Sequence, residues 1–267
     1  MRRDHDTESP DRNLNDLAPP IRKVACVMTD RPDIPAAVKR EVRQKCHFGC
    51  VLCGMPIYNF DHIEKYSVVR EHDPNNLVLL CPNHHAEKTS GSLSQVTVEK
   101  ALSAPFNKVR MSTTPHLLHM TGDEARFEVG GNAFEFSFSQ VRGYFQAIVL
   151  AGQTVVGMRL ENDRLLIDLT LNDPQGKAIL EVARGELSIS TGVWDFEMVG
   201  PRIVIRSAER QISLELEILA NGIAIRRGLF IQPPITLRVE PSRFTSFPDR
   251  NVFQGCTIRG QSGLMIT

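Results

Sequence analysis

The stretch from Cys50 to Lys88 constrains this chain more than any other part of its sequence. It reads CVLCGMPIYNFDHIEKYSVVREHDPNNLVLLCPNHHAEK and contains three of the six cysteines and four of the eight histidines among the 267 residues. Two sets of side chains are interleaved in it: an outer frame with the spacing of metal ligands, and an inner set of acidic, amide and imidazole groups. We therefore expect the chemistry of the protein to be concentrated here.

The outer frame consists of two ligand pairs, and two residues separate the members of each pair. Its members are Cys50, Cys53, Cys81 and His84. Two thiols at this spacing can bind one metal from a tight turn, and Gly49 and Gly54 bracket the first pair. Tetrahedral zinc takes four such ligands in a closed site. A redox C-x-x-C is the alternative, but it leaves Cys81 and His84 unexplained. We predict a structural Zn²⁺ site.

The rest of the composition agrees with a metal site. The start of the sequence has no apolar core of a signal peptide, and the apolar stretches fall far short of a membrane span. We therefore expect a cytoplasmic protein with no membrane partner, in which grouped cysteines indicate a metal rather than disulfides. Cys26, Cys46 and Cys256 stand outside the pattern and are expected to be small buried or surface thiols rather than ligands, although a ligand role stays open for Cys46, which lies only four residues before Cys50. The 31 basic and 31 acidic residues cancel, so any attraction to nucleic acid must come from local patches.

The inner set has the residue types that phosphodiester hydrolysis needs. Its members are Asp61, His62, Asn76 and His85. The reaction requires a base that takes a proton from water and a cation that stabilises the leaving oxygen. A neutral imidazole suits the first task near pH 7, and a carboxylate with a second imidazole can hold a divalent cation for the second. His72, in the loop between these residues, is expected to be exposed.

A basic helix is predicted just before the outer frame. Pro35 suits the first turn of a helix, and Val38 and Val42 recur on one face over residues 36–45. The remaining positions include Lys39, Arg40, Arg43 and Lys45. Such a helix could lie along a phosphate backbone, or its charges could form an ordinary solvated face. Further on, a buried strand is predicted at Leu77–Leu80 and a helix at Val96–Ala104.

These elements together resemble the HNH endonucleases, whose ββα-metal site is often clasped by a zinc knuckle. The resemblance covers about residues 34–89 and rests on C-x-x-C-G, D-H-I, N-L-x-L-L-C and H-x-x-K in that order. His84 stands where many members have a fourth cysteine, and Cys3His is a chemically sound zinc site. The usual glycine pair between D-H-I and the asparagine is replaced by KYSVVREHDP.

The resemblance implies a role for each member of the inner set. His62 would be the general base, and Asp61 and His85 would bind a catalytic Mg²⁺ or Mn²⁺. Asn76 would fix the loop that orients His62, and Lys88 would contact phosphate. The expected function is a metal-dependent endonuclease acting on DNA. A zinc-stabilised nucleic-acid-binding module without cleavage activity is the alternative.

From residue 117 onward the sequence changes character. Short apolar–polar alternations are separated by Gly, Asn, Asp and Pro, which predicts an all-β domain. We expect a sandwich or a barrel, with a short β-solenoid as the alternative. The similarity of Met158–Asp168 to Phe196–Arg206 predicts repeated hairpins. Trp194 is expected in the core.

The sequence as a whole predicts an α+β protein with two domains. We expect a flexible leader at 1–30, the HNH domain at 31–106, a linker at 107–116 and the all-β domain at 117–267. The β domain could recognise nucleic acid, bind a small-molecule or protein regulator, or assemble subunits into a homo-oligomer. A bacterial defence setting is implied by the resemblance alone.

Overall fold

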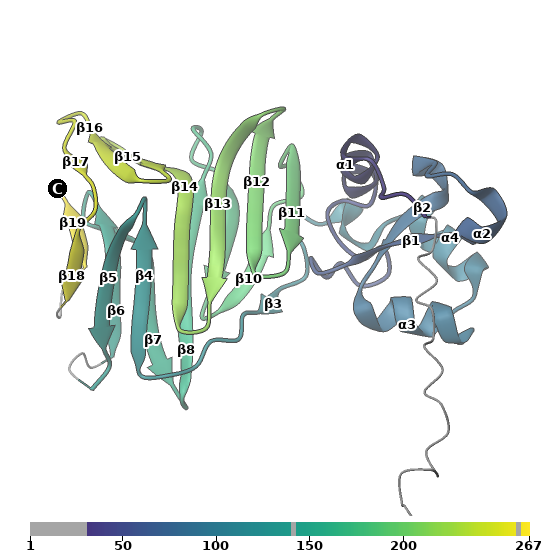
Figure 1. Ribbon diagram of the computed structural model, residues 1–267, viewed down its shortest axis with the longest axis horizontal. Coiled ribbons are helices and arrows are strands. Elements are labelled where there is room, and N and C mark those ends of the chain that lie inside the picture. The colour runs from purple at the N-terminus through teal and green to yellow at the C-terminus, as the bar shows by residue number, and fades with distance from the viewer. Residues whose placement is uncertain (1–30, 140–142, 260–262) are drawn as a thin grey trace, which may run out of the picture. The chain divides into compact units, whose positions relative to one another are not determined.

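The computed structural model describes residues 31–139, 143–259 and 263–267. The predicted flexible leader, residues 1–30, lies outside the described residues. From Ile34 to Thr267 the chain forms one compact unit. A small α/β region with the cysteine cluster comes first in this unit, and a large β-rich region follows (Figure 1). The domain boundaries expected at residues 106 and 116 stay predictions.

The α/β region contains a two-stranded antiparallel sheet and four helices. In chain order its elements are α1 (Ala36–Lys45), β1 (Asn59–His62), α2 (Tyr66–Val69), the 3-10 turn η2 (Pro74–Asn76), β2 (Leu77–Leu80), α3 (Pro82–Ser90), α4 (Gln95–Ser103) and the 3-10 turn η3 (Phe106–Val109). In the sheet, Asp61 lies opposite Val78 and His62 lies opposite Leu77. The two central residues of the inner set are thus carried by one short strand.

Local signals explain where these elements begin and end. Pro35 immediately precedes α1, and Val42 on one face of this helix is fully buried. The side chain of Ser94 accepts a hydrogen bond from the Thr97 amide and caps α4, and α3 ends at Gly91, whose φ of 84° suits glycine. All four side chains of β2 are buried. The predicted helix at 36–45 and strand at 77–80 are therefore confirmed, and the helix predicted at Val96–Ala104 is found one residue earlier.

The β-rich region contains the remaining strands of the chain. They are β3 (His116–Leu117), β4 (Glu124–Val129), β5 (Asn132–Ser137), β6 (Tyr144–Leu150), β7 (Gln153–Glu161), β8 (Arg164–Asn172), β9 (Ala178–Ala183), β10 (Glu186–Ile189), β11 (Asp195–Val199), β12 (Arg202–Ala208), β13 (Gln211–Leu219), β14 (Gly222–Gln232), β15 (Ile235–Glu240), β16 (Arg243–Phe247), β17 (Val252–Phe253), β18 (Thr257–Arg259) and β19 (Leu264–Ile266).

These strands form two open mixed sheets. One has the order β19-β6-β7-β8-β9-β10-β3, and the other has the order β11-β12-β13-β14-β15-β16-β17 with β4, β5 and β18 joined to it (Figure 1). Most neighbours are antiparallel, but β4 runs parallel to β14, β18 parallel to β5 and β19 parallel to β6. The β7–β8 and β11–β12 pairs confirm the predicted hairpins. The region is not a barrel.

The two sheets share one hydrophobic core. Ile148 and Leu165 enter it from the first sheet, and Phe196 and Leu214 from the second. Along β13 the buried leucines alternate with glutamates, which is the pattern of a strand with one face in the core. Trp194 is only half-buried and lies outside this core, so the expectation for Trp194 is wrong.

A buried ion pair connects α1 to the β-rich region. Arg43 donates from Nε and Nη2 to the two carboxylate oxygens of Asp195, at 2.8 Å each. Arg43 is 5% exposed and Asp195 is 2% exposed. Arg206 also donates to Asp195, at 3.2 Å. Because buried charges are stable only when they are paired, this contact holds α1 against the start of β11.

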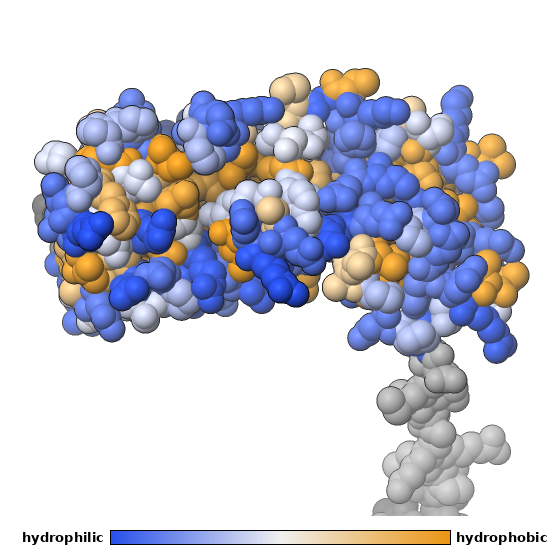
Figure 2. Space-filling model, turned by 90° about the horizontal axis from the view of Figure 1, so that it is seen from above, coloured by the Kyte–Doolittle hydropathy of each residue, from blue (hydrophilic) through white to orange (hydrophobic). Residues whose placement is uncertain are grey.

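Hydrophilic residues dominate the face shown in Figure 2, with hydrophobic groups between them. Such a mixture is ordinary, because apolar atoms supply roughly half of the accessible surface of a folded protein. None of the helices in the described part of the chain is long and apolar enough to cross a membrane.

Removal of the Asp195 carboxylate should destabilise the whole unit. In an Asp195→Ala variant, Arg43 and Arg206 lose a buried partner, and we expect the free energy of unfolding to fall by about 3–5 kcal/mol. Urea denaturation of the zinc-loaded protein measures this change. As a control, Arg202→Ala removes an ion pair with Glu215 in which the arginine side chain is 58% exposed, and should cost about 1 kcal/mol or less. Equal losses in the two variants would contradict a special role for the buried pair.

Candidate metal centre and active site

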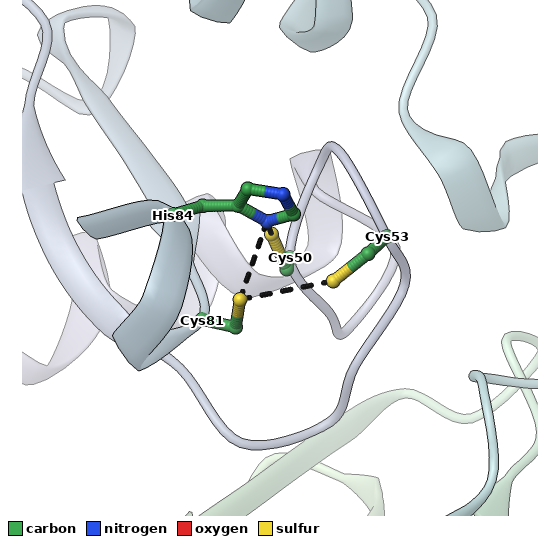
Figure 3. Close-up of side chains that lie close together, drawn as sticks. All are labelled: Cys50, Cys53, Cys81 and His84. Atoms are coloured by element: carbon green, nitrogen blue, oxygen red, sulfur yellow. Dashed lines mark hydrogen bonds between the residues drawn. The ribbon is translucent and has the colours of Figure 1, made fainter. Parts of the chain in front are cut away.

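The four residues of the outer frame converge on one point (Figure 3). Their ligand atoms all lie within 4.8 Å of one another. The Sγ atoms of Cys53 and Cys81 are 3.8 Å apart, and Nδ1 of His84 is 3.3 Å from Sγ of Cys50. Two sulfurs bound at about 2.3 Å to a tetrahedral zinc ion would be about 3.8 Å apart. Three thiols and one imidazole at these separations fit a structural metal such as zinc.

Each ligand pair is presented by a short turn anchored to β2. Cys50 and Cys53 lie in a tight turn after α1, in which the Gly54 amide donates to the Cys50 carbonyl at 2.7 Å. The Val51 amide donates to Leu79 in β2. Cys81 follows the last residue of β2 and precedes α3, so His84 falls in the first turn of that helix. One end of β2 therefore carries both pairs.

Asn107 lies outside the predicted nuclease domain and forms hydrogen bonds with the turn that carries Cys50 and Cys53. Its Nδ2 donates to the carbonyls of His47 and Gly54, both at 3.1 Å, and its side chain is completely buried. A Cβ at Gly49 would lie 2.5 Å from Nδ2 of Asn107, and one at Gly54 would lie 2.2 Å from its Oδ1. Both glycines are thus required for close packing. Thr114 also donates to the Cys53 carbonyl, at 2.6 Å.

Sequence reasoning missed Asn107 and Thr114, which fall in the predicted linker at 107–116. No local motif marks them, because their partners lie more than fifty residues earlier in the chain.

The thiols near the centre have unequal acidity. A hydrogen bond from Cys53 lowers the pKa of Cys50 to about 4, and the same coupling raises the pKa of Cys53. A thiolate is the form that binds a metal. Cys46 is fully buried nearby but does not belong to the cluster, and burial raises its pKa to about 12. Cys46 therefore remains a protonated structural thiol, as expected from its position outside the pattern.

Asp61 lies beside two residues of α3. Its Oδ1 is 3.6 Å from Nε2 of His85, and its Oδ2 accepts a hydrogen bond from Nζ of Lys88 at 2.5 Å. Lys88 also donates to the His62 carbonyl at 2.5 Å. A carboxylate oxygen and an imidazole nitrogen at this distance can contact one divalent cation. The pair therefore fits the ligand set expected for a catalytic metal.

His62 is on the same strand but has different neighbours. It is 5% exposed, and its Nε2 lies 3.2 Å from Nδ1 of His72. Successive side chains of a strand point to opposite faces, which explains why Asp61 and His62 are surrounded differently. His72 is half-buried rather than exposed, so the expectation for this residue is wrong.

Asn76 closes the turn that follows His62. Its Oδ1 accepts from the Glu64 amide at 2.8 Å, and its Nδ2 donates to the Glu64 carbonyl at 3.0 Å. The Asn76 carbonyl accepts from the Ile63 amide at 2.8 Å. These three bonds hold the backbone after His62 in one conformation.

The basic residues of α1 do not share one environment. Arg43 is bound to Asp195, and the guanidinium of Arg40 lies 4.9 Å from the centre of the Trp194 ring. Lys39 lies on the same helix and is half-buried. Lys88, the basic residue on α3, instead donates a hydrogen bond to Asp61, which is a member of the inner set.

Two antiparallel strands, a following helix and a Cys3His cluster define a small ββα module with a metal centre. Residues 50–91 match the family model described as HNH endonuclease. The chain thus carries an HNH endonuclease domain in this segment, and the β-rich region remains unassigned. No curated protein and no solved structure gave a significant match to the chain.

Loss of one frame cysteine should remove the structural metal. In a Cys81→Ser variant we expect the zinc content to fall from about one ion per chain to nearly none, because a closed site needs all four ligands. The α/β region should unfold at the same time, since metal binding and folding are coupled. Metal analysis and thermal melting measure both effects. Cys256→Ser removes an exposed thiol outside the cluster and should retain full zinc. Parental zinc content in Cys81→Ser would contradict the assignment.

Proposed function

We propose that this protein is a metal-dependent endonuclease that hydrolyses phosphodiester bonds of DNA. The observation that carries the proposal is the placement of His85 and Lys88 beside Asp61, on the strand that also carries His62, whose backbone carbonyl accepts from Lys88, within the segment that matches the HNH endonuclease model. An anionic carboxylate on a surface that meets phosphate is useful mainly when a cation is present. This favours cleavage over a binding module without activity.

We assign the base function to His62. Its imidazole can take a proton from water near neutral pH, and the bonds that Asn76 makes to the following turn keep its backbone in place. Asp61 and His85 would hold Mg²⁺ or Mn²⁺, which when bound stabilises negative charge on the leaving oxygen. Lys88, which is paired with Asp61 at 2.5 Å, would supply a positive charge for phosphate.

Contacts to the DNA backbone are proposed for basic residues at two positions. Lys39 on α1 is suited to a phosphate contact, and Lys88 on α3 would make one if it leaves Asp61. Arg40 could reach phosphate only if it leaves Trp194, and Arg43 only if it leaves Asp195. We infer that Arg43 mainly fixes α1. The β-rich region thereby positions the basic helix, whether its further role is recognition, regulation or assembly.

Replacement of the proposed base should abolish cutting without loss of structure. For His62→Ala we expect the cleavage rate to fall by about 10²–10⁴-fold, the usual contribution of a general base. Plasmid, single-stranded DNA and RNA, each with Mg²⁺ or Mn²⁺, serve as substrates, and zinc content and melting temperature should match the parent. His119→Ala, at an exposed histidine of the β-rich region, is the matched control and should cut normally. Retention of DNA by the parent without any cleavage would support the binding-module alternative.

Removal of the Asp61 charge should weaken the catalytic metal specifically. Asp61→Asn keeps the shape of the side chain but removes its negative charge, so we expect the Mn²⁺ concentration for half-maximal cutting to rise by about tenfold or more. A titration of the cleavage rate with Mn²⁺ measures this, and the structural zinc should be unchanged. Asp123→Asn, at an exposed aspartate outside the site, should leave the titration unaltered. An unchanged midpoint in Asp61→Asn would exclude Asp61 as a ligand.

A further inference from the structure

A second imidazole contacts the proposed base. Nδ1 of His72 lies 3.2 Å from Nε2 of His62, and the ring centres are 5.3 Å apart. This is hydrogen-bond distance between two ring nitrogens. The roles assigned above use Asp61, Asn76 and His85 but leave this contact without a purpose.

The surroundings of His72 hold its ring in place. Tyr66 stacks on it with a centroid distance of 4.9 Å and an interplanar angle of 24°, and the same tyrosine meets His62 edge-on at 5.3 Å. The next residue, Asp73, caps η2 by accepting from the Asn75 amide at 2.9 Å. Aromatic packing and a fixed backbone thus orient His72 toward His62.

A neutral imidazole has one N–H group and one nitrogen with a lone pair, and the hydrogen bond at one nitrogen decides which is which. We propose that His72 accepts a hydrogen bond from Nε2–H of His62 and thereby holds His62 in the tautomer whose Nδ1 carries the lone pair. The inference rests on the proposed function of His62 as the base. His72 is a positioning residue, because it acts through His62.

The proton balance of the reaction is simple. Nδ1 of His62 takes one proton from water, the water oxygen forms the new bond to phosphorus, and the bond to the leaving oxygen breaks with its electron pair on that oxygen. His72 neither gains nor loses a proton. As His62 becomes positively charged, its Nε2–H bond to His72 becomes charge-assisted and therefore stronger. The contact thus favours the transition state over the ground state.

Two variants separate this role from simple packing. His72→Phe keeps a ring for Tyr66 but removes the acceptor, and we expect kcat to fall by about 10²-fold with KM for DNA nearly unchanged. His72→Asn places an amide oxygen close to the position of Nδ1, and should recover most of the parental kcat. Zinc content and melting temperature should match the parent in both. Parental activity in His72→Phe, or equal loss in the two variants, would overturn the proposal.

A measurement without cleavage tests the tautomer directly. The ¹⁵N chemical shifts of the His62 ring, recorded on zinc-loaded full-length protein without Mg²⁺ and under conditions in which the ring is neutral, should show a protonated Nε2 in the parent and in His72→Asn. His72→Phe should show a mixture of tautomers. A protonated Nδ1 in the parent would overturn the inference. If the parent cuts no nucleic acid, the proposed function fails, whereas these shifts still decide whether His72 sets the tautomer.

Discussion

The Cys3His cluster is the constraint on which the nuclease-type site depends. A sheet of two four-residue strands buries too little surface to be stable alone, so the α/β region needs another source of stability. A metal held by the cluster would supply it by joining the turn after α1 to the end of β2 and the first turn of α3. Everything between Cys53 and Cys81, including Asp61 and His62, would thereby be confined to a closed loop.

Secondary-structure geometry then distributes the reactive groups. On β1, Asp61 faces His85 and Lys88 while its neighbour His62 meets His72, as the alternation of a strand requires. On α3, His84 points into the metal cluster and His85 toward Asp61, because successive helical residues are rotated by about 100°. One strand and one helix turn thus separate the outer frame from the inner set, although members of the two sets are adjacent in the sequence.

The β-rich region contacts the α/β region at α1 and at the residues that follow this helix. The contacts that join them include the Arg43–Asp195 pair, a hydrogen bond from Gln44 to the Trp194 carbonyl at 2.7 Å, and Phe48, which belongs to the core between the two sheets. A structural change near the start of β11 would therefore alter the contacts of α1, the helix that precedes the turn with Cys50 and Cys53.

The sequence by itself determined the metal frame, the HNH resemblance, the short elements around them and an all-β region. These rest on spacing and periodicity, which are local properties. Charge pattern placed Arg43 on a helix surface, yet only the fold showed that Asp195, 152 residues away, buries it. Asn107, Thr114 and His72 were likewise missed or misjudged, because their importance comes from contacts that no local pattern encodes. Metal-ligand residues can be identified from residue type and spacing. The burial of a side chain and its hydrogen-bond partners are instead decided by which distant segments of the chain pack together.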